Sequence, residues 1–126
     1  MISSIHHLAL IVSSEECLDF YKVLGFQEFF RKDRSSDTVV LMRGFGILLE
    51  VFIDSSHPSR NSENYTESTG LRHFALQVEG VLEDEISRLR KESTKELIIS
   101  SVMKDWQGMR FVHIKDYDGN IVELHE

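Results

Sequence analysis

Two histidines and two glutamates stand at matching places along the chain. His7 and His73 each open an apolar segment, and Glu50 and Glu123 each interrupt a later one. Imidazole and carboxylate groups suit borderline divalent ions, and an unpaired carboxylate inside an apolar strand is costly to bury. The pattern therefore predicts one metal centre, with His7, Glu50, His73 and Glu123 as ligands and an open position for a small-molecule substrate.

The two histidines belong to an internal repeat. Residues 7–12 read HLALIV and residues 73–78 read HFALQV, so the His, Ala, Leu and Val positions are shared. Each segment has the composition of a strand and leads into a helical pattern. In the first half, Ser13 or Ser14 is expected to cap the helix, and Gly25 to end it.

The remaining apolar segments are expected to be strands. In each half, two of them flank a turn: Gly44-Phe45-Gly46 in the first half and residues 116–119 in the second. Each half is therefore predicted to have the order β-α-β-β-β. The expected strands after the helices are 26–31, 38–43 and 47–53, then 97–102, 109–115 and 120–125.

This order predicts an α+β fold in which two repeated βαβββ modules form a cupped mixed sheet. The modules are residues 1–53 and 71–126, and a polar, mobile linker of residues 54–70 joins them. Each module is too small to cover both faces of its own sheet, so the two are expected to pack together, in one chain or across a dimer. The whole chain, 1–126, is predicted to be a single domain.

Composition narrows the function classes. The chain has 126 residues, of which 41% are hydrophobic and 28% charged, which excludes a mainly disordered chain. A net charge of −7 argues against nucleic-acid binding. No apolar run is long enough to span a membrane, and the N-terminus lacks the pattern of a signal peptide. With Cys17 as its single cysteine, the protein is expected to be cytoplasmic.

Other side chains near these positions receive different expectations. His125 shares the expected strand face of Glu123 and is predicted to lie beside the metal or in the pocket wall. His113 is expected to be structural, and His6 to lie at the surface. Trp106, in an expected loop, is predicted either to line a substrate pocket or to serve in packing.

The sequence resembles the vicinal oxygen chelate superfamily and, within it, the glyoxalase I group. The resemblance covers essentially the whole chain. It implies paired βαβββ modules, usually in a homodimer, and in many members a site between subunits. The motifs that carry it are His7-x-Ala9-Leu10-x-Val12, Phe20-Tyr21-x-x-Leu24-Gly25-Phe26, Leu49-Glu50, His73-Phe74-Ala75-Leu76-x-Val78 and Asp118-Gly119-Asn120-Ile121-Val122-Glu123-Leu124.

The order His, Glu, His, Glu matches the metal set of bacterial glyoxalase I, which implies nickel, cobalt or zinc. The implied activity is that of a lactoylglutathione lyase-type enzyme, acting on a vicinal-oxygen substrate such as an α-oxoaldehyde–thiol hemithioacetal. The metal would stabilise an enediolate while a carboxylate removes and returns a carbon-bound proton. Glu123 is the first choice for this base and Glu50 the second.

Two positions depart from the glutathione-using type. That type has an arginine four residues after the first histidine, where this chain has Ile11, and an asparagine four residues after the first glutamate, where it has Asp54. Both changes disfavour an anionic tripeptide, so another thiol or another vicinal-oxygen substrate is expected.

Two alternatives remain open at this point. Thiol transferases that act on antibiotics, and ring-cleaving dioxygenases, share the fold and generally use two His and one Glu. A binding protein of the bleomycin-resistance kind would sequester a small molecule without chemistry.

Overall fold

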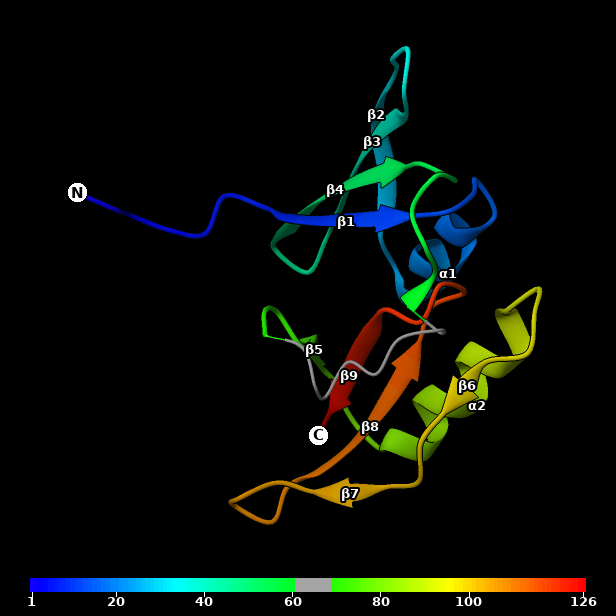
Figure 1. Ribbon diagram of the computed structural model, residues 1–126. Helices are drawn as coiled ribbons and strands as arrows, with labels where there is room; N and C mark the ends of the chain where they lie inside the picture. The colour runs from blue at the N-terminus through cyan, green and yellow to red at the C-terminus, as the bar shows by residue number, and fades with distance from the viewer. Residues whose placement is uncertain (61–68) are drawn as a thin grey trace. The chain divides into compact units, whose positions relative to one another are not determined.

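The computed structural model describes residues 1–60 and 69–126 (Figure 1), and residues 61–68 of the expected linker lie outside them. The described chain divides into two compact units, residues 1–58 and 59–126. Each unit forms its own mixed sheet with one helix, so the α+β class and the repeated module are confirmed. Neither helix has the length and apolar character needed to cross a membrane.

Unit 1 has the predicted βαβββ order. Its sheet has the strand order β1-β4-β3-β2, in which β1 and β4 are parallel and the other pairs antiparallel. The elements are β1 (Leu8–Val12), α1 (Cys17–Leu24), β2 (Gln27–Asp33), β3 (Thr38–Gly44) and β4 (Ile47–Ile53).

Glycine determines where α1 ends. Gly25 has φ +119°, a left-handed conformation that ends the helix as the sequence predicts. A Cβ at Gly25 would lie 2.8 Å from Cζ of Phe45, so a larger residue at position 25 would also clash with the phenyl ring. The boundary residue is Glu16, later than the expected serine, and its side chain makes no capping hydrogen bond. The hydroxyls of Ser13 and Ser14 lie 3.9 and 3.5 Å from Cys17 Sγ.

Unit 2 repeats this arrangement with one difference. The expected strand 97–102 is wrong in its bounds, because only residues 98–99 of it form a strand. A second strand of two residues follows at 103–104, and both pair with the next long strand. The sheet order is β5-β9-β8-β6, with β7 also paired to β8. The elements are β5 (Phe74–Gln77), α2 (Leu82–Glu92), β6 (Ile98–Ile99), β7 (Met103–Lys104), β8 (Arg110–Lys115) and β9 (Ile121–His125).

The start of α2 is held by the end of the chain. Val81 at the helix boundary makes no side-chain cap, and the free N–H of Leu82 donates instead to Glu126 Oε1 at 2.9 Å. Leu82 and Leu89 are fully buried along one side of the helix. The helix thereby attaches to the strand end that follows Glu123.

Each unit has one buried sheet face. In β9, Val122 and Leu124 are buried while Ile121, Glu123 and His125 are only partly buried, and β4 alternates in the same way about Glu50. The glutamates therefore lie on the sheet faces opposite the cores. The buried apolar residues are Val12, Cys17, Leu18, Phe20, Tyr21, Leu24, Phe26, Val40, Met42, Leu49 and Val51 in unit 1, and Leu76, Leu82, Leu89, Leu97, Val112, Ile114, Val122 and Leu124 in unit 2.

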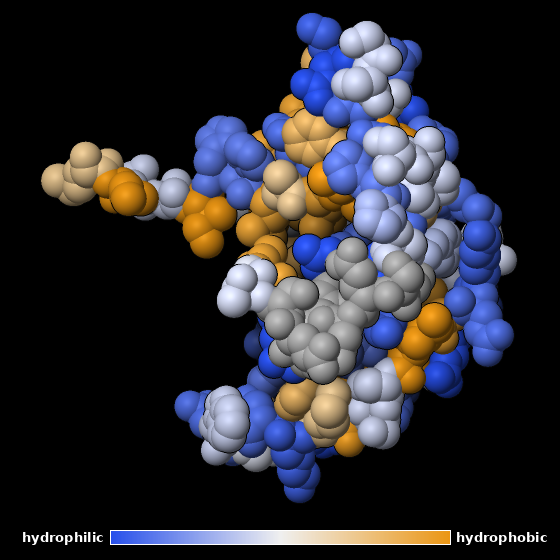
Figure 2. Space-filling model, in the orientation of Figure 1, coloured by the Kyte–Doolittle hydropathy of each residue, from blue (hydrophilic) through white to orange (hydrophobic). Residues whose placement is uncertain are grey.

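The N-terminal residues extend away from the sheet of unit 1 (Figures 1 and 2). Figure 2 shows apolar surface along this arm, on which Met1, Ile2 and Ile5 are all exposed. The strand that carries Ala9 opposite Glu50 begins only at Leu8. His7 therefore lies at the base of the arm, directly before the strand.

Candidate metal centre

Glu123 occupies the middle of a three-residue row across the sheet of unit 2. It lies on β9 between β5 and β8, where it is paired with Ala75 on one side and His113 on the other. The side chains of directly paired residues point to the same sheet face. The pairing therefore places the imidazole of His113 beside the carboxylate of Glu123.

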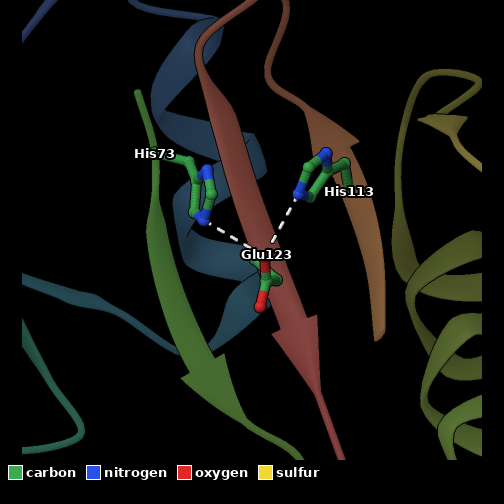
Figure 3. Close-up of side chains that lie close together, drawn as sticks. All are labelled: His73, His113 and Glu123. Atoms are coloured by element: carbon green, nitrogen blue, oxygen red, sulfur yellow. Dashed lines mark hydrogen bonds and ion pairs between the residues drawn. The ribbon is translucent and has the colours of Figure 1, made fainter. Parts of the chain in front are cut away.

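His73 approaches the same carboxylate from the other side (Figure 3). Nε2 of His73 lies 3.1 Å from Glu123 Oε2, and Nε2 of His113 also lies 3.1 Å from that oxygen. The rings of the two histidines have centroids 5.0 Å apart. Two imidazole nitrogens thus converge on one carboxylate oxygen, and Glu123 keeps only 13% of its side-chain surface exposed.

This donor set fits a divalent ion. The three ligand atoms lie within 4.8 Å of one another. With bonds of about 2.1 Å, neighbouring donors lie about 3 Å apart in octahedral geometry and about 3.4 Å apart in tetrahedral geometry, and the observed 3.1 Å is between these values. Among the described residues, the buried Nδ1 of His73 has no hydrogen-bond partner, so the ring is held through its Nε2 side. Two imidazoles and a carboxylate are chemically suited to zinc, nickel, cobalt, manganese or iron.

A turn fixes the position of His113 relative to Glu123. Between β8 and β9, the carboxylate of Asp116 accepts the backbone N–H groups of Asp118 at 2.9 Å and Asn120 at 2.8 Å, and also the Asn120 side-chain amide at 2.8 Å. Asp116 is itself 2% exposed. The turn makes Lys115 the partner of Ile121, and the pairing of His113 with Glu123 follows from it.

The structure places His113, which is expected to be structural, in one cluster with His73 and Glu123. A signal for it was present in the sequence. Strand pairing runs symmetrically about the turn at residues 116–120, and counting back from Glu123 across that turn reaches residue 113. Comparing the two halves of the repeat does not reveal His113, because the corresponding position in unit 1 holds an apolar residue, Leu41.

The other two predicted ligands belong to unit 1. Glu50 lies on β4, partly buried, paired with Ala9 on one side and Leu41 on the other. His7 is exposed directly before β1, and its Nδ1 lies 2.9 Å from Nδ1 of His6. The structure brings together His73 and Glu123 of the predicted set, and the complete four-residue set stays a prediction.

His125 lies on the site face but has partners of its own. Its Nε2 lies 2.8 Å from Asp105 Oδ2, and its Nδ1 lies 2.7 Å from the backbone oxygen of Glu126. The hydrogen bond with Asp105 is the main reason that the pKa of His125 is raised above its usual value. The ring also stacks on Phe111, with 3° between the planes. His125 thus lies on the same sheet face as the cluster, as the strand alternation predicts.

Sequence reasoning missed Asp105, whose Oδ1 also accepts the N–H groups of Gln107 at 2.8 Å and Met109 at 2.9 Å. These two bonds and the His125 contact lower the pKa of Asp105, the Met109 bond most strongly. Trp106, in the same turn, is fully exposed, so it does not pack against the described residues of its own unit.

Comparison with known proteins places this chain in a family. Residues 4–124 match the Glyoxalase/Bleomycin resistance protein/Dioxygenase superfamily, and the chain belongs to it. No curated protein matches the chain. Among solved structures, a glyoxalase family protein from Enterococcus faecalis is 30% identical, with a TM-score of 0.83 and coverage of 98% of this chain and 97% of that one.

Two more distant structures show the same fold. Lactoylglutathione lyase from Agrobacterium tumefaciens is 22% identical, with a TM-score of 0.69 and coverage of 99% of this chain and 94% of that chain. A variant of the fosfomycin resistance protein FosX from Listeria monocytogenes, complexed with Mn(II) and 1S,2S-dihydroxypropylphosphonic acid, is 17% identical. Its TM-score is 0.72, with coverage of 99% and 90%. At these identities the two structures are evidence for a shared fold, and one of them contains Mn(II).

Proposed function

We propose that this chain is a divalent-metal-dependent, glyoxalase I-like lyase or isomerase acting on a vicinal-oxygen small molecule, such as an α-oxoaldehyde–thiol hemithioacetal. The observation that carries the proposal is the 3.1 Å approach of His73 to Glu123, two of the four residues expected as ligands. His7 and Glu50 would complete the set, and nickel, cobalt or zinc would occupy it. The manganese in the FosX complex supports a divalent ion in this fold.

The roles of the residues follow from their chemistry. When bound, a divalent ion supplies positive charge that stabilises negative charge developing on the substrate oxygens. Glu123 would accept the carbon-bound proton and return it to the neighbouring carbon, with Glu50 as the second choice. His73 and His113 border Glu123 on both sides, and they restrict the positions from which its carboxylate can reach a substrate. Phe111 and His125 extend the same face as an aromatic wall.

The thiol carrier is proposed to differ from glutathione. Ile11 is 47% exposed on β1, opposite Phe52, and offers an apolar surface where an anionic tripeptide would need a cation. The carboxylate of Asp54 already accepts the backbone N–H of Ser56 at 2.9 Å and its hydroxyl at 2.6 Å, and the hydroxyl bond is the main cause of the lowered pKa of Asp54. Both features favour a smaller or neutral thiol.

The first test is elemental analysis of tag-free protein purified without chelator, repeated on His73→Ala. We expect about one transition metal per chain, lost in the variant. Methylglyoxal hemithioacetals of glutathione and of 2-mercaptoethanol would then be compared, and we expect the neutral adduct to be converted more efficiently. Full activity in metal-stripped protein would refute the proposed chemistry. If the protein takes up no metal and binds a small molecule without converting it, the result would instead support a binding protein that sequesters small molecules.

We also propose that the protein is a homodimer. The exposed apolar residues Met1, Ile2 and Ile5 are the kind of surface that a second copy would cover. Light scattering on the full chain should give twice the chain mass, and removal of residues 1–5 should weaken the association. A monomer at micromolar concentration would contradict this.

A further inference from the structure

The two units carry the same row of paired residues, except at one position. In unit 1 the row is Ala9, Glu50 and Leu41, and in unit 2 it is Ala75, Glu123 and a histidine, His113. The sheet of unit 1 forms with leucine at this position. The fold therefore does not require an imidazole there, and the reason for His113 must lie in what its ring contacts.

His113 is held firmly on its strand. Its backbone N–H donates to Ser100 Oγ at 3.0 Å, and its backbone oxygen accepts the N–H of Ser100 at 2.9 Å. Its ring lies between those of His73 and Phe111, with centroid distances of 5.0 and 5.4 Å. These contacts direct Nε2 of His113 towards Glu123 Oε2 (Figure 3).

We propose that His113 is itself a ligand of the divalent ion, so that unit 2 supplies a complete set of His73, His113 and Glu123. The inference rests on the proposed metal dependence and adds a ligand to it. Both histidine nitrogens lie 3.1 Å from the same glutamate oxygen, a distance suited to neighbouring donors around one ion. Three donors leave up to three octahedral positions, which His7, Glu50 or substrate oxygens could fill.

This assignment has a consequence for metal retention. If His7 and Glu50 were indispensable ligands, a double variant of them would lose the ion. With a three-donor set in unit 2, the double variant keeps it, with lower affinity. His113→Ala, in contrast, removes a donor from the set that remains.

The experiment uses the full chain, stripped of metal and titrated with Co(II) by calorimetry. His113→Ala is expected to raise the Kd by more than about 100-fold, beyond the roughly 10- to 100-fold effect of losing a group that only orients a ligand. The matched control is His125→Ala, a histidine on the same face whose two nitrogens contact Asp105 and Glu126. It should change the Kd less than about threefold. Circular dichroism would confirm that both variants fold.

A second variant separates ligation from a simple hydrogen bond to Glu123. His113→Gln keeps an N–H donor but no imidazole, so we expect its Co(II) affinity to stay as low as that of His113→Ala. In the proton NMR spectrum of the Co(II) protein, each bound imidazole gives a shifted, exchangeable N–H signal, and His113→Ala should lose one.

The outcomes are distinguishable. Wild-type Co(II) affinity in His113→Ala, or recovery in His113→Gln, would overturn ligation by His113 while leaving the proposed function intact. Loss of the ion from the His7→Ala/Glu50→Gln double variant would overturn the claim that unit 2 supplies a complete set. A wild-type chain that binds no Co(II) would overturn the proposed function as well.

Discussion

Leu41 and His113 occupy equivalent positions in the two units, each directly paired with the glutamate of its last strand. The backbone arrangement around Glu50 and Glu123 is therefore the same, while the chemistry beside each carboxylate differs. An apolar neighbour gives Glu50 no donor from β3, whereas Glu123 has an imidazole nitrogen at 3.1 Å. The repeat thus builds two similar rows, of which the one in unit 2 carries the cluster of His73, His113 and Glu123.

Metal should stabilise the folded protein. An ion that binds only the folded chain at a free concentration 100 times its Kd adds about 2.7 kcal/mol to the free energy of unfolding. For a chain of this length, this corresponds to a rise in Tm of roughly 10 °C. Differential scanning fluorimetry with Ni(II), Co(II) or Zn(II), against chelator-treated protein, measures it. His73→Ala should show no rise, and an equal rise in that variant would assign the binding to another place.

Glu123→Gln should reduce turnover far more than a surface substitution. A positioned base contributes about 10²- to 10⁴-fold to rate, so kcat is expected to fall within that range. Exchange of the substrate C–H proton with deuterated solvent should slow in parallel. The control is Glu96→Gln, an exposed residue before β6. If Glu50→Gln abolishes the exchange while Glu123→Gln keeps it, with metal still bound in both, Glu50 is the base.

Asp116→Ala should destabilise the hairpin that carries the cluster. The change leaves the N–H groups of Asp118 and Asn120 without their acceptor, at a cost of about 2–4 kcal/mol in the free energy of unfolding. Asp116→Asn keeps an oxygen acceptor and should cost less. Urea denaturation of both variants, followed by Co(II) titration, tests whether the turn also controls metal affinity. Wild-type stability in Asp116→Ala would show that the carboxylate of Asp116 does not hold the turn.

Asp105 gives the fold a predictable acid dependence. Its pKa is lowered below the ordinary value of 3.8, first by the N–H of Met109, then by that of Gln107 and by His125. A carboxylate with a lowered folded-state pKa stabilises the protein above its unfolded-state pKa, and the contribution is lost as pH falls through the folded-state value. Asp105→Asn should therefore lower Tm at pH 7, and the difference from wild type should shrink below about pH 4. A constant difference across pH would rule out a charge effect.

Periodicity predicted most of the secondary structure, and the reasons for the exceptions are local. Helix α1 ends at Gly25 as expected, because a glycine after an apolar helical pattern is a strong sequence signal for a left-handed helix end. Within the segment 97–102 only Ile98–Ile99 pairs with β8, and the next pairing begins beyond it at Met103–Lys104, a division that propensity does not reveal.

The repeat marks His73 and Glu123, which the structure brings together, but it does not mark His113 or Asp105. His73 and Glu123 were found because each has a counterpart in the first half. His113 has Leu41 as its counterpart, and Asp105 acts through a turn whose hydrogen bonds depend on three-dimensional pairing. The internal repeat identifies the residues that the two modules share. Residues that are present in one module alone can be predicted only when the strand register is known.

The connection between Lys115 and Ile121 also limits how this part of the sequence can evolve. Side chains alternate between sheet faces, so gaining or losing one residue between that connection and Glu123 would turn the carboxylate into the core and bring Val122 or Leu124 out. Many residues of this segment can be replaced during evolution, but a change in the number of its residues would remove Glu123 from the cluster. Among natural variants, we therefore expect the length of this short segment to be preserved more strictly than its composition.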